Sequence, residues 1–162
     1  MRKLSAGILI YRYRGQSLEV FLVHPGGPLW KNKDLGSWSL PKGEYSQEEN
    51  AFEAAKREFR EETGFAPPEG EYTPLGEIRQ PSGKVVTAWA VEGDCPAEEI
   101  QSNTFPMEWP PKSRRMQQFP EVDRAEWFPF AVAKAKIPPG QAGFLERLAS
   151  HLGYAEKPSV SY

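Results

Sequence analysis

The chain has very little cysteine, since Cys95 is the only one in its 162 residues. A lone cysteine excludes an intrachain disulfide and a zinc site built from several cysteines. We therefore expect a cytoplasmic protein rather than a small secreted domain held together by disulfides.

The sequence also lacks a long apolar segment. Its basic start, MRKLSAGILIYRY, contains only a short apolar run before tyrosine and arginine, and no small-residue cleavage site follows. No apolar run approaches the roughly 20 residues that cross a bilayer. We read this stretch as a strand and expect no membrane partner.

An excess of charge of one sign is absent as well, because the formal net charge is only -2 at pH 7. So small a charge provides no broad field for nucleic acid, which argues against bulk nucleic-acid binding and favours local contact with a nucleotide. The length fits one domain, which we place at residues 1–153, with residues 154–162 as a flexible tail. The oligomeric state stays open.

Local patterns predict a mixture of strands and helices. Clusters of aliphatic and β-branched residues predict strands at residues 5–13, 18–24, 72–79, 84–92 and 124–128. Apolar residues at helical spacing predict helices over about 47–63 and 141–152. Residues 25–38 and the proline-rich residues 94–116, which carry Lys112, Arg114 and Arg115, are predicted to be loops, the second a lid or an insertion.

The first predicted helix has clear end signals. Ser46 followed by Glu49 forms a capping box that starts the helix near Gln47, and Gly64 is suited to a left-handed cap after Thr63.

Three glutamates of this helix occupy unusual positions. Its apolar stripe includes Ala51 and Phe59, and at about 100° per residue Glu58 and Glu62 fall at the border of that stripe, with Glu61 next to them. Like charges three and four positions apart destabilise a helix unless a cation lies among them. Hard oxygen ligands of this kind suit Mg²⁺ or Mn²⁺ and a bound diphosphate. The alternative is that the acids merely pair with the neighbouring cations Lys56, Arg57 and Arg60.

Residues 43–65 read GEYSQEENAFEAAKREFREETGF, with the spacing glycine, five residues, glutamate, seven residues, then REFREETGF. This segment resembles the Nudix box without a substitution, so the chain is similar to Nudix hydrolases. The resemblance implies an α+β protein, a three-layer α/β/α sandwich with a mixed central sheet.

The resemblance also implies roles for individual residues. Glu58 and Glu62 would be metal ligands, Glu61 would bind or orient a second metal or its water, and the Gly43 carbonyl would add a ligand. Arg57 would orient a glutamate through its planar fork. A further acidic ligand from outside the box is expected at Glu121, with Asp123 and Glu126 as competitors and a solvated loop acid as the alternative. The general base is left open among Glu58, Glu61 and Glu121.

The segment WSLPKG before the box resembles the diadenosine polyphosphate hydrolase branch, and it also occurs in diphosphoinositol polyphosphate and mRNA-decapping relatives. Lys42, Arg79 and Lys84 are candidates for contacts with phosphate, and Trp30, Trp38 and Tyr45 are candidates for stacking on a base. Core packing of the aromatic rings and a solvated lysine are the alternatives.

These observations predict a divalent-metal-dependent pyrophosphohydrolase that uses Mg²⁺ or Mn²⁺. Its substrate would be a nucleoside diphosphate linked to another group, such as a dinucleoside polyphosphate or an NTP. The alternative is a binding module that senses a nucleotide or ADP-ribose without turnover.

Overall fold

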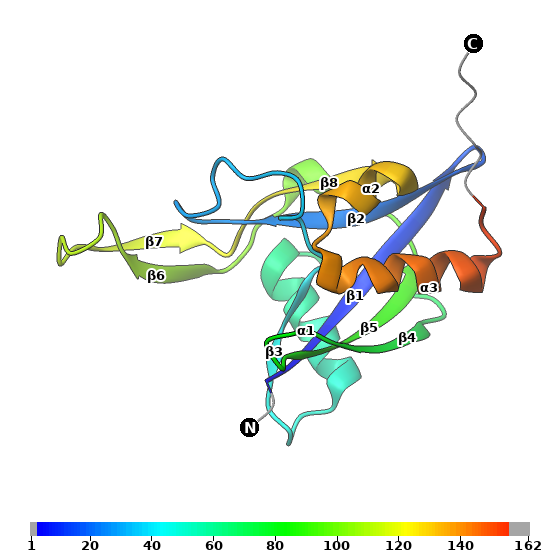
Figure 1. Cartoon of the computed structure of the whole chain (residues 1–162), viewed down its shortest axis with the longest axis horizontal. Helices are drawn as coiled ribbons and strands as arrows, with labels where there is room; N and C mark the ends of the chain where they lie inside the picture. The colour runs from blue at the N-terminus through cyan, green and yellow to red at the C-terminus, as the bar shows by residue number, and fades with distance from the viewer. Residues whose placement is uncertain (1–2, 156–162) are drawn as a thin grey trace, which may run out of the picture.

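The computed structural model describes residues 3–155. Its elements, shown in Figure 1, are β1 (Leu4–Arg14), β2 (Ser17–Pro25), β3 (Lys42–Tyr45), α1 (Ala51–Thr63), β4 (Thr73–Arg79), β5 (Val85–Glu92), the 3-10 turn η1 (Ala97–Glu99), β6 (Thr104–Glu108), β7 (Met116–Pro120), β8 (Val122–Pro129), α2 (Phe130–Lys136), the 3-10 turn η2 (Pro139–Gln141) and α3 (Ala142–Leu152). No helix in this part of the chain is long and apolar enough to span a membrane. Residues 156–162 of the expected tail lie outside the described residues.

The central sheet is mixed, as expected. Its strand order is β4-β5-β1-β2-β8, and β3 pairs with the start of β1. The β1–β5 pair is parallel and the other pairs are antiparallel. Because β3 lies against β1 with Gly43 opposite Ala6, the box begins at the start of this central strand.

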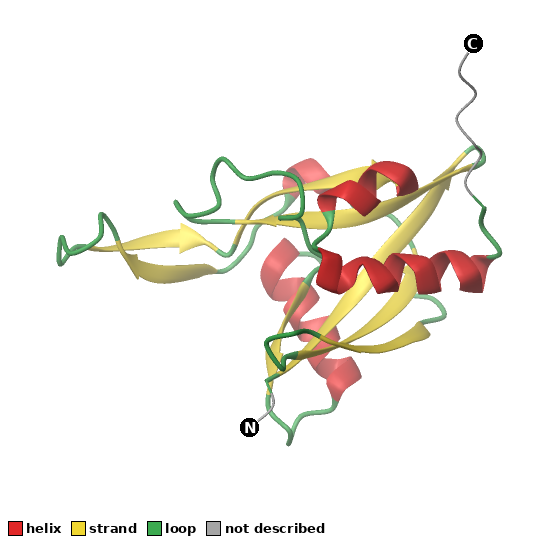
Figure 2. Cartoon of the chain, viewed as in Figure 1, coloured by secondary structure: helices red, strands yellow, loops and turns green. Residues whose placement is uncertain are grey.

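Helices cover both faces of the sheet, with α1 on one side and α2 and α3 on the other (Figure 2). Strand β1 shows why its sequence is apolar almost throughout: Ala6, Ile8 and Ile10 pack toward α1, whereas Leu9 packs into the core shared with α2 and α3. A strand buried on both faces loses the usual alternation of polar and apolar residues. The predicted three-layer α/β/α sandwich is confirmed.

Helix α1 begins later than the sequence predicts. Its N-cap is Asn50, whose Oδ1 accepts a 3.0 Å hydrogen bond from the Glu53 N–H. Ser46 and Glu49 instead form a turn before the helix, in which the Ser46 N–H donates to Glu49 Oε1 over 3.2 Å. The predicted end is correct, because Gly64 has a φ of 80° and donates its N–H to the Arg60 carbonyl.

Two further segments differ from the prediction. Strands β6 and β7 form a hairpin over residues 104–120, most of which lies in the predicted loop of residues 94–116. The sequence does not show this hairpin because Pro106, Pro110 and Pro111 hide the alternation of its strands. Helix α2 follows β8 directly and was not predicted, since its seven residues are too few to show helical periodicity.

Candidate active site

The glutamates Glu58, Glu61 and Glu62 of the box lie in one surface cleft of about 480 Å³ beside the start of β1. The cleft is lined by Pro25, Gly26, Trp30, Lys42, Gly43, Glu44, Glu58, Glu61, Glu62, Phe105 and Glu121. Four carboxylates that the sequence singles out, those of Glu58, Glu61, Glu62 and Glu121, therefore share this cleft. Helix α1 supplies three of them, and the fourth follows β7.

Gly43 is placed against the carboxylate of Glu58. A Cβ atom at position 43 would lie 1.9 Å from Glu58 Oε2 and 2.1 Å from its Cδ, so only glycine leaves room for this side chain. Glu58 itself is 8% exposed. Burial, and then the charge of Glu61, raises the pKa of the Glu58 carboxyl.

Arg57 joins the glutamates from the side of the helix. Its Nη1 donates to Glu58 Oε1 over 2.9 Å and to Glu61 Oε1 over 3.2 Å, and its Nη2 donates to Glu49 Oε2 over 3.2 Å. The guanidinium thus contacts two cleft carboxylates through Nη1 and Glu49 through Nη2, so its planar fork joins three acids.

Lys42 and Glu62 are residues of opposite charge that lie close together. The main-chain N–H of Lys42 donates to Glu62 Oε1 over 3.1 Å. Burial raises the pKa of Glu62 to about 8, and burial together with the charge of Lys84 lowers the pKa of Lys42 to about 8. For both groups the cost of desolvation exceeds their mutual attraction, which is typical of ions withdrawn from water.

Glu121 is held in place by main-chain hydrogen bonds. Its carbonyl accepts from the Gly26 N–H over 2.9 Å, and its own N–H donates to the Asn103 carbonyl over 2.8 Å. Burial, and then the charge of Glu61, raises the pKa of the Glu121 carboxyl. The charge of Glu61 therefore acts on the Glu121 carboxyl in the same cleft.

The donor set fits a hard divalent cation in its chemistry. All four side chains offer carboxylate oxygens, the ligands that Mg²⁺ and Mn²⁺ prefer. Burial, and then the neighbouring carboxylates, raise the pKa of Glu58, Glu62 and Glu121, and a cation among them would favour the charged forms instead. In the described residues no three acidic, histidine or cysteine side chains already converge on one point, so binding would require the glutamates, some of them held by Arg57, to turn.

The remaining predicted residues are scattered. Trp38, a candidate for stacking on a base, lies in the core and is only 2% exposed. Its Nε1 donates to Asp34 Oδ1, and its ring packs against His24 and Phe128, so it has no free face for a base. Tyr45 packs beside the core under α1 and does not line the cleft.

The other two cations predicted to meet phosphate also lie outside the cleft lining. Arg79 is exposed at the end of β4. Lys84 lies near Lys42, as its effect on the pKa of that residue shows.

Two aromatic residues stand at the cleft instead. Trp30 is 40% exposed, and Lys33 Nζ lies 5.1 Å from the centre of its ring. Phe105 enters from the hairpin, and a Cβ at Gly27 would lie 3.1 Å from its ring. The sequence offered a signal for Phe105 in the alternation of Phe105, Met107 and Trp109, which the prolines obscured.

A buried histidine ties two walls of the cleft together. His24 is fully buried; its Nδ1 lies 2.8 Å from Asp123 Oδ1, and its Nε2 lies 2.7 Å from the Lys33 carbonyl oxygen. The contact joins the end of β2 to β8 and to the loop that carries Trp30.

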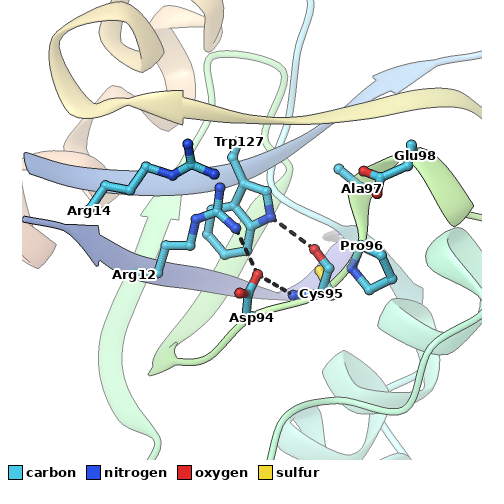
Figure 3. A pocket seen from close by; sticks show the side chains of 8 residues that line it. All are labelled: Arg12, Arg14, Asp94, Cys95, Pro96, Ala97, Glu98 and Trp127. Atoms are coloured by element: carbon cyan, nitrogen blue, oxygen red, sulfur yellow. Dashed lines mark hydrogen bonds and ion pairs between the residues drawn. The ribbon is translucent and has the colours of Figure 1, made fainter.

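A second pocket lies toward the opposite end of β1 (Figure 3). Arg12 stacks 4.1 Å from the centre of the Trp127 ring and forms ion pairs of 2.8 Å with Glu19 and with Asp94. Because this guanidinium is already paired with two carboxylates, the pocket is poorly suited to an anion. Burial, and then the charge of Asp94, raises the pKa of the Cys95 thiol in its wall to about 12.

Comparison with known proteins agrees with this geometry. The family model described as NUDIX domain matches residues 1–148, so the chain belongs to the Nudix family. No curated protein matches it.

Several solved structures share the fold. One is an Ap4A hydrolase of C. elegans in a binary complex, with a TM-score of 0.64 and 19% identity over 93% of this chain and 98% of that chain. Another is the NUDIX domain of Shewanella oneidensis NrtR complexed with ADP ribose, with a TM-score of 0.62 and 20% identity over 94% and 89%. A MutT protein from Methanosarcina mazei Go1 has a TM-score of 0.58 and 20% identity over 93% and 95%.

Proposed function

We propose that the protein is a divalent-metal-dependent pyrophosphohydrolase that cleaves a diphosphate linkage in a nucleotide. The observation that supports this most directly is the gathering of Glu58, Glu61, Glu62 and Glu121 in one cleft, with Gly43 shaped around the Glu58 carboxylate. Burial raises the pKa of three of these acids, Glu58, Glu62 and Glu121, and acids of raised pKa gathered in a cleft are characteristic of functional sites.

The residues divide the work by position. Glu58, Glu61, Glu62 and Glu121 would hold Mg²⁺ or Mn²⁺ with the Gly43 carbonyl, and such ions lower the pKa of bound water and neutralise charge on phosphate oxygens. Arg57, which contacts both Glu58 and Glu61, would fix the orientation of these glutamates beside the bound metal. A cleft glutamate that is not engaged as a ligand accepts the proton of the attacking water. Glu58, Glu61 and Glu121 remain the candidates for this base.

The substrate would enter between the glutamates and the two aromatic rings. Lys42 lines the cleft beside Glu62 and is placed to meet a phosphate. Trp30 and Phe105 offer apolar faces at the same cleft, where a nucleoside base can stack. A nucleoside diphosphate linked to another group, such as a dinucleoside polyphosphate, fits this arrangement.

Hydrolysis of a substrate panel in Mg²⁺ tests the proposal. We expect release of phosphate or nucleotide from at least one nucleoside polyphosphate, and a loss of at least about 100-fold in the Glu62→Gln variant, the order of one electrostatic group at the reacting phosphate. Glu53→Gln is the matched control, because Glu53 is exposed on the same helix. An active Glu62→Gln enzyme would contradict the assignment of this cleft.

The alternative is a module that binds a nucleotide without turnover, as a NUDIX domain complexed with ADP ribose makes conceivable. The complete set of cleft acids favours the enzyme. Calorimetric binding of ADP-ribose or a dinucleotide by a wild type that hydrolyses nothing on the panel would support the sensor instead.

A further inference from the structure

The hairpin of β6 and β7 is an arm that projects from the body of the domain (Figure 1). Its two strands form a sheet of their own, and no other strand or helix of the described chain packs extensively on it. An isolated two-stranded hairpin is marginally stable in water, so an arm of this kind gains stability when a ligand lies along it.

The base of the arm is fastened to the active-site glutamates. The Asn103 N–H donates to the Glu61 carbonyl over 2.7 Å, and the Glu121 N–H donates to the Asn103 carbonyl over 2.8 Å. Phe105, the second residue of β6, lines the cleft itself. The arm is therefore continuous with the cleft wall, and a ligand that leaves the cleft beside Phe105 meets it.

One face of the arm carries a row of apolar side chains. Phe105, Met107 and Trp109 alternate with exposed residues and so lie on the same face, because side chains alternate along a strand. Phe119 adds a second ring, with its centroid 6.2 Å from that of Phe105. The row leads outward from the cleft.

The tip of the arm is positively charged. Lys112, Arg114 and Arg115 are exposed there, and none of them forms an ion pair within residues 3–155. Glu108 is the only acid in residues 104–120, and its carboxylate accepts a 2.8 Å hydrogen bond from the Lys112 N–H. This concentration of positive charge contrasts with the net charge of -2 for the whole chain.

The length of the arm determines which charges the tip can attract. The five residues of β6 span about 17 Å. Exposed charges are screened beyond about 8 Å at physiological salt, so the tip cannot act on a phosphate bound at the glutamates. Its cations must act on negative charge that extends out of the cleft, beyond the reach of a mononucleotide.

We propose that the arm binds a single-stranded nucleic acid whose 5′-terminal phosphates lie at the glutamates. This assignment rests on the proposed function and specifies its substrate class. An apolar row that contains the rings of Phe105, Phe119 and Trp109 and ends in cations suits stacked bases and a phosphate backbone, because every base offers a face for stacking. An acidic peptide would use the cations but not the aromatic row.

The test compares two substrates that share the cleaved linkage, a 5′-triphosphorylated ten-nucleotide RNA and the matching NTP. Wild-type protein is expected to have a kcat/KM at least about 10-fold higher for the RNA than for the NTP at low salt, which corresponds to about 1.4 kcal/mol. Three cations on a single strand correspond to a salt slope of about -2, or about a 16-fold loss between 50 and 200 mM salt.

The arm variant Lys112→Asn/Arg114→Asn/Arg115→Gln removes the charge. Asparagine is chosen because Lys112 and Arg114 have φ values of 62° and 61°, which asparagine tolerates better than most residues. We expect this variant to lose the preference for RNA and most of the salt dependence while it hydrolyses the NTP at the wild-type rate.

The control variant Arg14→Gln/Lys56→Gln/Arg60→Gln changes the net charge equally at residues outside the arm, and it should keep the preference. Equal wild-type kcat/KM for RNA and NTP, or an arm variant that behaves like the control, would overturn the inference. An acidic peptide of equal charge that competes as well as the RNA would also overturn it.

Direct binding separates the two proposals. If the wild type hydrolyses neither substrate, the proposed function fails, but fluorescence anisotropy with the same labelled RNA still reports on the arm. Binding that the arm variant abolishes and the control variant retains would support the arm, and binding that is equal in all three proteins would refute it.

Discussion

Substitution of Gly43 by alanine is the sharpest test of the active-site geometry. The added Cβ would lie 1.9 Å from Glu58 Oε2, whereas real Cβ contacts essentially never fall below 3.0 Å. The carboxylate must therefore move by about 1.1 Å, the difference between these two distances. Because Glu58 is 8% exposed and bonded to Arg57, this movement also disturbs the contact of 2.9 Å between them.

We expect a large loss of activity and a small loss of stability. A misplacement of about 1 Å in an active site can cost about 100-fold in rate. Overpacking costs about 1–3 kcal/mol, and the smaller entropy of the unfolded alanine chain offsets about 0.4–1 kcal/mol of it, because the φ of Gly43 is not positive. The net change in the free energy of unfolding should be about 1–2 kcal/mol.

The assay is Mg²⁺-dependent hydrolysis together with urea unfolding of the same preparation. Gly140→Ala is the matched control, because its new Cβ would have no neighbour closer than 3.4 Å and its φ is also not positive. In a double-mutant cycle, Gly43→Ala should cause little further loss of stability once Glu58 is replaced by alanine, because the shorter side chain leaves room for the new Cβ. A Gly43→Ala enzyme with unchanged kcat/KM, or an equal loss of stability in the Glu58→Ala background, would refute the reasoning.

Two other predictions concern the start of α1 and the buried thiol of Cys95. Asn50→Ala should lower the free energy of unfolding by about 1 kcal/mol, because it removes the side-chain cap of α1. Ser46→Ala should lower it by less than half of that amount in the same urea titration. The reverse order would place the start of the helix at Ser46. The Cys95 thiol should react with a disulfide reagent at pH 8 about 1,000-fold more slowly in the native protein than after unfolding, because its pKa is about 12 instead of 9.0. A native reaction rate equal to the unfolded rate would contradict the burial of this thiol. Because the pKa of the thiol is higher in the folded protein, the thiol stabilises the fold below pH 9, and this contribution is lost as the pH rises toward 12.

The sequence predicts the central fold well because its main signals are strong and local. The apolar stretches of β1, β2 and β5 and the glycine after α1 appear directly in the residues. The glutamates of the box also meet in one cleft, since their spacing places them on one side of a regular helix.

The remaining features depend on tertiary contacts that local patterns do not encode. Asn50 outcompetes Ser46 as the cap because the chain between them turns before the helix begins. Trp38 is buried by its packing on Phe128, which is 90 residues away in sequence, so it cannot contact a substrate. Three prolines conceal the hairpin, and only its pairing across the chain shows that Phe105 reaches the cleft.

The buried ring of His24 has a consequence for the width of the cleft. A carbonyl oxygen only accepts hydrogen bonds, so the contact of 2.7 Å with Lys33 requires a hydrogen on Nε2. The other ring nitrogen, Nδ1, lies 2.8 Å from Oδ1 of Asp123, so both nitrogens are engaged by neighbouring segments. The loop of Trp30 and the strand that follows Glu121 are thus spaced by one rigid, planar ring. That ring sets the separation of the aromatic wall from the acidic wall before any substrate arrives.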